Sequence, residues 1–238
     1  MNNPRAESLF HFTRSLDFLK SIIKNGIYPR YCLETSWSKY GKEDYYAFLI
    51  SCFCDIPLSR ITEHTNFYGQ YGLGLTKDWG VKNGLNPVIY FPENGSILKL
   101  ANYLMELTHN NRHKLNDKEY KTNITNLLKL MKPINGKVEA TGIIKDFYQE
   151  NEWRYAPEID FGIAKSQFSL TSEAENKKAE IYKLEITSND IKYIFVKDDA
   201  DIPAISDFID IEMSHLPHAD IKILQSRIIS LETIRSDL

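Results

Sequence analysis

Four short motifs carry the side chains that could do chemistry. The first holds an imidazole, His11, which titrates near neutral pH. The last holds two carboxylates, Glu150 and Glu152, and a fixed carboxylate can stabilise positive charge on a substrate. Tyrosines lie between them, and the π-face of a tyrosine can hold a flat group. In chain order the motifs are Leu9-Phe10-His11-Phe12-Thr13, Phe53-Cys54-Asp55-Ile56-Pro57-Leu58-Ser59, Tyr68-Gly69-Gln70-Tyr71-Gly72-Leu73-Gly74-Leu75 and Glu150-Asn151-Glu152-Trp153-Arg154.

The same residues have structural interpretations. A single His on a short apolar strand is often part of the core, and Tyr71 on an aromatic strand needs no ligand to explain it. Along a strand, Glu152 and Arg154 share one face and Trp153 points to the other. Glu152 and Arg154 could therefore pair while Trp153 fills the core.

The sequence lacks metal and nucleotide motifs of established spacing. Cys52-x-Cys54 is too short for a zinc knuckle, and Pro217 interrupts the helix that would align His215 with His218. There is no Walker lysine motif, no G-x-S-x-G elbow and no Rossmann fingerprint. We expect no metal site.

Strands and helices must position the motifs. Apolar spacing from Ser15 to Asn25 predicts a helix that Ser15 or Thr13 caps and Gly26 ends. The run from Tyr45 to Phe53 is typical of a buried strand. We also expect strands at 9–13, 69–75, 87–91, 138–144, 181–186 and 191–196, helices at 59–68, 97–107 and 120–131, and a mobile loop at 167–178.

This mixture predicts an α+β fold with a mainly antiparallel sheet. No internal repeat and no linker rich in Pro, Gly or Ser divides the chain. We therefore expect a single domain over residues 1–238, with a helical insertion at about 96–132.

Composition narrows the class of protein. The net charge of −3 and the pI of about 6.1 argue against a strongly electrostatic nucleic-acid binder. Three cysteines and no secretory signal indicate a reducing cytoplasm. No apolar run approaches the roughly 20 residues that span a membrane. We expect a cytoplasmic protein without a membrane partner.

Taken together, the four motifs resemble the AbiGi family of bacterial abortive-infection proteins. That family has an HFT-like start, an FCDIPLS-like centre, a YGxYGxGL segment and a closing EWR. The similarity spans nearly the whole chain. It implies a role in antiviral (phage) defence and a cognate toxin or antitoxin protein as partner, the family having been described as the antitoxin of an abortive-infection pair.

The opening of the chain is also similar to ADP-ribosyltransferase-fold proteins, including the DarT-type DNA ADP-ribosyltransferases. The shared pattern is a strand with His-x-Thr, a helix, and then Gly-Ile. The similarity implies an ADP-ribosyltransferase-like split sheet, NAD as cofactor, and transfer of ADP-ribose to a nucleic acid or protein. It places catalytic residues at His11, Tyr71 and Glu152, with Glu150 as a rival carboxylate, and cofactor-binding residues at His11, Phe12, Thr13, Tyr68, Tyr71 and Arg154.

Two functions follow from these observations. An NAD-dependent enzyme requires His11, a tyrosine and Glu152 to meet in one cleft. A non-enzymatic antitoxin or regulatory subunit instead buries His11 and Glu152 in structural hydrogen bonds and exposes an apolar patch elsewhere.

Overall fold

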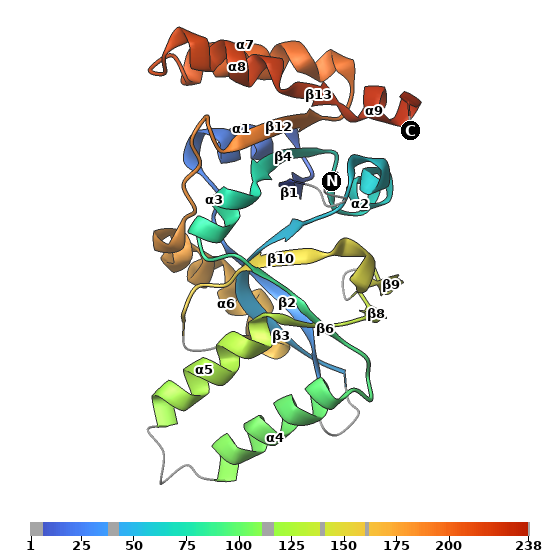
Figure 1. Ribbon diagram of the computed structural model, residues 1–238. Helices are drawn as coiled ribbons and strands as arrows, with labels where there is room; N and C mark the ends of the chain where they lie inside the picture. The colour runs from blue at the N-terminus through green and yellow to red at the C-terminus, as the bar shows by residue number, and fades with distance from the viewer. Residues whose placement is uncertain (1–6, 38–42, 111–116, 139–140, 160–161, 238) are drawn as a thin grey trace. The chain divides into compact units, whose positions relative to one another are not determined.

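The computed structural model describes residues 7–37, 43–110, 117–138, 141–159 and 162–237. These residues form an α+β fold with mainly antiparallel strand pairing, as predicted (Figure 1). The described part divides into two compact units. The first comprises 7–27, 52–84 and 184–237, and the second the described residues of 28–51 and 85–183. The single domain expected over residues 1–238 stays a prediction.

The first unit is built on a sheet in the order β13-β12-β4-β1-β3. Strand β13 is parallel to β12, and the other neighbours are antiparallel. The strands are β1 (Ser8–Thr13), β4 (Tyr71–Thr76), β12 (Ile191–Val196), β13 (Ile228–Ser230) and the end of β3 (Glu43–Cys54). The helices are α1 (Leu16–Asn25), α2 (Ile61–Tyr68), α3 (Lys77–Lys82), α7 (Ile202–Glu212), α8 (His218–Ser226) and α9 (Leu231–Asp237), with short 3-10 turns η1 (Leu58–Arg60) and η4 (Asp199–Asp201).

Helix α1 begins and ends where local sequence signals predict. The side chain of Ser15 accepts a hydrogen bond from the backbone N–H of Phe18, which caps the first turn. Gly26 ends the helix with a φ of 84°, a conformation that glycine adopts without strain. Leu19 and Ile23, four residues apart, are the buried residues of the helix.

The glycines of β4 make room for aromatic rings of the two flanking strands. Gly74 pairs with Phe10 of β1 on one side and Tyr193 of β12 on the other. A Cβ atom on Gly74 would lie 2.7 Å from the Tyr193 ring, and one on Gly72 would lie 2.5 Å from the His11 carbonyl oxygen. The protein's own side chains and backbone therefore occupy the space beside these two glycines.

The second unit combines several small pairings around the long strand β3. Strand β2 (Arg30–Trp37) and β11 (Ile163–Ala164) each pair antiparallel with β3, and β10 (Glu152–Tyr155) pairs with β5 (Asn86–Pro87). Strand β6 (Ile89–Phe91) is parallel to β7 (Met131–Pro133), and β8 (Asn135–Lys137) forms a hairpin with β9 (Ile144–Asp146). The helices are α4 (Ser96–Asn110), α5 (Asp117–Lys129) and α6 (Lys165–Lys178), with 3-10 turns η2 (Phe147–Glu150) and η3 (Ala179–Tyr182).

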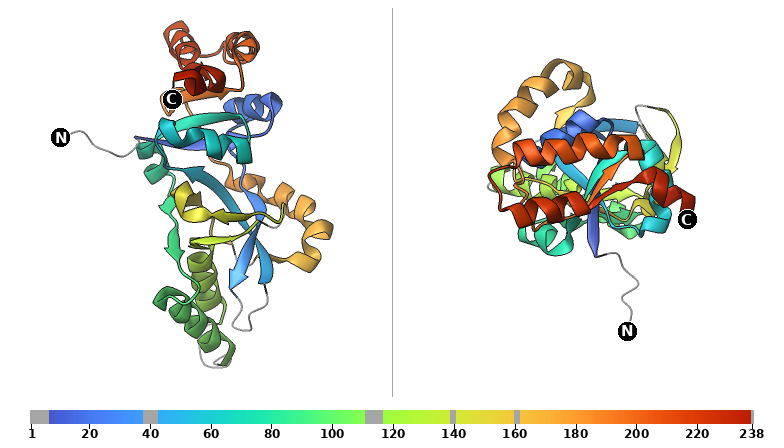
Figure 2. Two further views of the ribbon diagram at one scale, coloured as in Figure 1. Left: turned by 90° about the vertical axis from the view of Figure 1, so that its right-hand side faces the viewer. Right: turned by 90° about the horizontal axis from the view of Figure 1, so that it is seen from above.

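Helices α4 and α5 lie side by side in the segment where the sequence predicts helices (Figure 2). Leu98 and Ala101 of α4 pack with Phe91 and Met131 in one hydrophobic cluster. No helix among the described residues is both long and apolar enough to cross a membrane.

Four expected elements differ in the structure. The strand expected at 87–91 is divided into β5, which pairs with β10, and β6, which pairs with β7. Residues 167–178, expected as a loop, belong to helix α6, whose side chains are so polar that none is buried. In the expected strand 181–186, Ile181 lies in η3 and is 82% exposed, while Leu184 forms an isolated bridge with Ile27. The expected strand 138–144 lies largely between β8 and β9, with residues 139–140 outside the described part.

Candidate functional site

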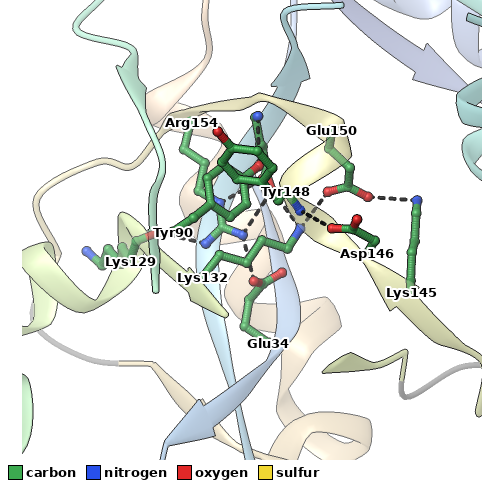
Figure 3. A network of polar contacts seen from close by, with 10 residues as sticks. Glu34, Tyr90, Lys129, Lys132, Lys145, Asp146, Tyr148, Glu150 and Arg154 are labelled. Atoms are coloured by element: carbon green, nitrogen blue, oxygen red, sulfur yellow. Dashed lines mark hydrogen bonds and ion pairs between the residues drawn. The ribbon is translucent and has the colours of Figure 1, made fainter. Parts of the chain in front are cut away.

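The second unit holds a buried network of charged side chains, and Lys132 lies at its centre (Figure 3). The ammonium group of Lys132, on β7, lies 2.8 Å from a carboxylate oxygen of Glu150 and 2.6 Å from one of Glu152. All three side chains are less than 10% exposed. The other oxygen of Glu150 lies 2.7 Å from the ammonium group of Lys145. We call Glu34, Lys132, Lys145, Glu150, Glu152 and Arg154 the charge network.

Arg154 is fully buried and closes the other side of this network. Its Nε donates to Glu152 at 2.7 Å, because residues two apart on β10 share one face. Its Nη2 donates to Glu34 of β2 at 2.6 Å, and its Nη1 to the carbonyl of Lys129 at 2.8 Å. Charge-assisted bonds of this kind are the strong ones in proteins. The pairing of Glu152 with Arg154 is the structural alternative that the sequence left open.

Two further side chains attach the network to its surroundings. The hydroxyl of Tyr90, on β6, accepts the backbone N–H of Glu152 at 2.9 Å, and burial raises the pKa of Tyr90. The ammonium group of Lys129, the last residue of α5, donates to the carbonyls of Pro157 at 2.8 Å and Ile159 at 3.1 Å. Helix α5 and strands β6 and β10 are thus held to one polar centre.

The carboxyl group of Glu150 is held in its charged form. Burial alone would raise its pKa. The adjacent ammonium groups of Lys132 and Lys145 lower the pKa by more than burial raises it, so the net pKa lies below the ordinary value of 4.5. The folded state therefore binds fewer protons at this site than the unfolded chain. The resulting stabilisation is present above about pH 4.5 and is lost as the pH falls through the folded-state pKa.

The lowered pKa of Glu150 gives a first testable prediction about the pH dependence of stability. The free energy of unfolding of wild type and Glu150→Gln, measured by urea denaturation between about pH 3 and pH 7, should differ most near neutrality. The difference should shrink below about pH 4.5, because protonation then removes the same charge in the wild type. A difference that stays constant across this range would contradict the assignment of Glu150 as a charged partner of Lys132.

His11, in the first unit, has a defined tautomer. Its Nδ1 lies 2.8 Å from the carbonyl oxygen of Cys52, and a carbonyl only accepts, so Nδ1 carries the proton. Burial lowers the pKa of His11 more than this hydrogen bond raises it. The imidazole is therefore neutral at pH 7, with Nε2 as a hydrogen-bond acceptor.

The other expected residues of the first unit have partners of their own. The hydroxyl of Tyr71 donates to Asp201 at 2.9 Å, and burial together with this carboxylate raises the pKa of Tyr71 to about 12. The ring centroids of Phe12 and Phe195 are 5.4 Å apart, and those of Tyr68 and His64 are 4.6 Å apart.

Thr13 and Asp55 complete the early motifs of the first unit. Thr13 pairs with Tyr71 between β1 and β4. Asp55 forms an ion pair with Lys77 at 2.7 Å. The first pairing joins the first and third motifs within the sheet, and the ion pair joins the second motif to helix α3.

The expected site residues thus fall into two sets. One set belongs to the first unit and comprises His11, Phe12, Thr13, Tyr68 and Tyr71; the other belongs to the second and comprises Glu150, Glu152 and Arg154. Their joint action on NAD stays a prediction. Lys132 is not among the residues expected from the sequence, although a lysine between the apolar Met131 and Pro133 is a usable signal for a paired buried charge.

The geometry defines the class: an α+β protein of two compact units, one of them organised around a buried charge network. Comparison with known proteins names the family. The model of the family described as "Putative abortive phage resistance protein AbiGi, antitoxin" matches residues 25–197. The chain belongs to this AbiGi family, as its motifs predict.

A curated relative supports the assignment. The chain is 27% identical over 221 residues to the "Abortive phage resistance protein AbiGi" of Lactococcus lactis subsp. cremoris, an alignment that covers 79% of this chain and 88% of the relative. No solved structure matches the chain. An ADP-ribosyltransferase-like arrangement therefore stays a prediction.

Proposed function

We propose that this protein is the antitoxin of an abortive-infection pair and acts by binding its cognate toxin. The observation that carries the proposal is that both oxygens of the Glu152 carboxylate have cationic partners. Oε1 lies 2.7 Å from Nε of Arg154, and Oε2 lies 2.6 Å from Nζ of Lys132. A carboxylate neutralised on both sides is poorly suited to stabilise a developing cation on a substrate. The description of the family as antitoxin supports the same function.

A binding protein needs a contact surface, and helix α4 provides one. Ile97, Leu100 and Tyr103, spaced three residues apart, are 39%, 55% and 56% exposed. Residues at this spacing share one side of a helix. Leu98 and Ala101 of the same helix pack into the core cluster. We assign the stripe of Ile97, Leu100 and Tyr103 to the contact with the toxin.

Co-expression with the protein encoded next to this chain tests the proposal. The chain should restore growth to cells that produce the toxin and should co-purify with it. Leu100→Glu should weaken the complex by about tenfold or more, because it places a charge in an apolar contact. The matched control is Leu170→Glu on α6, an equally apolar residue that is 78% exposed. No rescue by the wild type would exclude the antitoxin function, and equal effects of both variants would exclude the α4 surface.

A second function is NAD-dependent ADP-ribosyl transfer to a nucleic acid or protein. The geometry of His11 supports it, because the Cys52 carbonyl holds Nδ1 at 2.8 Å and leaves Nε2 to accept a hydrogen bond from a hydroxyl group of a ligand. Incubation with NAD and detection of released nicotinamide tests it. If nicotinamide is released, Glu152→Gln should abolish release, whereas Glu150→Gln, which loses an equally buried ion pair with Lys132, should retain it. Absence of release and of NAD binding by the wild type would exclude this function.

A further inference from the structure

The first unit contains a hollow of about 320 Å³ where strand β1 ends, helix α2 ends and strand β4 begins. Arg14, Asn66, Gln70, Tyr71 and Lys197 are among the residues that line it. Gly69 also lines the hollow and has a φ of 139°. A Cβ atom there would lie 2.0 Å from the carbonyl oxygen of Thr13, so the chain after α2 lies directly against the end of β1.

Several hydrogen-bond donors around this hollow have unused capacity. The exposed guanidinium group of Arg14 and the side-chain amide of Gln70 make no hydrogen bond or ion pair with other residues of the described part. Lys197 has a loose ion pair with Asp198 at 3.4 Å, which leaves most of its donor capacity unused. Two cations and an amide thus face one small volume.

A third cation lies next to the lining residues. The Nη2 of Arg235 donates to Thr65 at 3.1 Å and to the side-chain oxygen of Asn66 at 3.2 Å. Since the oxygen of Asn66 faces Arg235, its NH₂ group is the end that remains for a ligand. The Nε of Arg235 is a buried donor without a hydrogen-bond partner among the described residues.

Two carboxylates lie nearby and set the balance of charge. Asp198 faces Lys197, and Asp201 accepts the hydroxyl proton of Tyr71, so this tyrosine contributes its ring rather than a donor. The guanidinium groups of Arg14 and Arg235 therefore have no carboxylate partner among the described residues, while Lys197 has only its loose pair with Asp198. Such a donor set suits a small tetrahedral anion with several acceptor oxygens.

We propose that this hollow binds the phosphoryl group of a small phosphorylated ligand. Arg14 and Lys197 neutralise the anion, and the amides of Asn66 and Gln70 donate to its remaining oxygens. The hollow belongs to the first unit and the α4 stripe to the second, and the binding of a small anion goes beyond the binding of a toxin. Because its probes are small anions, its test can fail while toxin binding succeeds.

Isothermal titration calorimetry of the full chain in low-salt, phosphate-free buffer tests the site with inorganic phosphate, adenosine monophosphate and adenosine. Both phosphate probes should bind and adenosine should not. Arg14→Gln and Lys197→Gln should each weaken binding by about tenfold, the effect of losing one charge-assisted hydrogen bond. Both substitutions should leave the fold intact, since Arg14 is exposed and the Lys197 side chain is 55% exposed.

Lys222→Gln on α8 is the matched control, because it removes the same charge from an exposed position of the same unit. It should bind phosphate like the wild type. Tighter binding of adenosine monophosphate than of phosphate would assign the ligand to the nucleotides, and equal binding would assign it to the phosphoryl group alone. Lack of saturable binding of both phosphate probes, equal binding of adenosine, or equal weakening by Lys222→Gln would overturn the proposal.

Discussion

Replacing Glu152 with glutamine should lower the free energy of unfolding by about 3–5 kcal/mol, the usual effect of removing one partner from a buried ion pair. The substitution keeps the shape of the side chain but removes its charge. Lys132 then retains Glu150, and Arg154 retains Glu34, so each carboxylate must neutralise more positive charge. An amide also cannot accept from Lys132 and Arg154 at both ends, because one end is now a donor.

Urea denaturation followed by circular dichroism measures this loss. The matched control is Glu175→Gln on α6, which removes a carboxylate from an exposed pair with Lys178 at 2.6 Å. Surface pairs of this kind contribute only about 0–1 kcal/mol. If Glu152→Gln and Glu175→Gln destabilise the protein equally, the charge network does not hold the second unit together, and the structural argument against a catalytic Glu152 fails with it.

Replacing Gly69 with alanine should be comparably severe, with a loss of about 3 kcal/mol or more from backbone strain and steric overlap combined. Its φ of 139° lies where side-chain-bearing residues are rare, and the new Cβ would lie 2.0 Å from the carbonyl oxygen of Thr13. Backbone atoms cannot move aside as the end of a flexible side chain can. The chain between α2 and β4 must then shift away from β1.

Gly84→Ala separates the two causes. Gly84 also has a positive φ, of 73°, but nothing lies within 4 Å of its added Cβ. Its substitution should therefore cost only about 1 kcal/mol of backbone strain. Thermal or urea unfolding of both variants gives the comparison. Similar losses would show that the close approach of Gly69 to Thr13 is not tight in solution.

The sequence was sufficient wherever the deciding interactions are local. Ser15 and Gly26 act within one turn of α1, so the limits of that helix follow from residue types alone. Period-two burial likewise places Glu152 and Arg154 on one face of β10. Local patterns misled at α6, because that helix carries no apolar stripe. They also misled at 181–186, where residues 181–182 complete the 3-10 turn η3 and Leu184 pairs only through an isolated bridge with Ile27.

Tertiary structure alone decided what the charged residues do. Glu152 finds Lys132 from 20 residues away, and Arg154 finds Glu34 from 120 residues away. The residue type of a carboxylate in a short motif does not show whether the side chain faces a substrate or a lysine. The sequence determined the family, the α+β class and locally specified elements such as helix α1, while the folded chain determined that both oxygens of Glu152 have cationic partners. The physical reason is that a buried charge is costly unless an opposite charge pairs with it, and only the fold brings the two charges together.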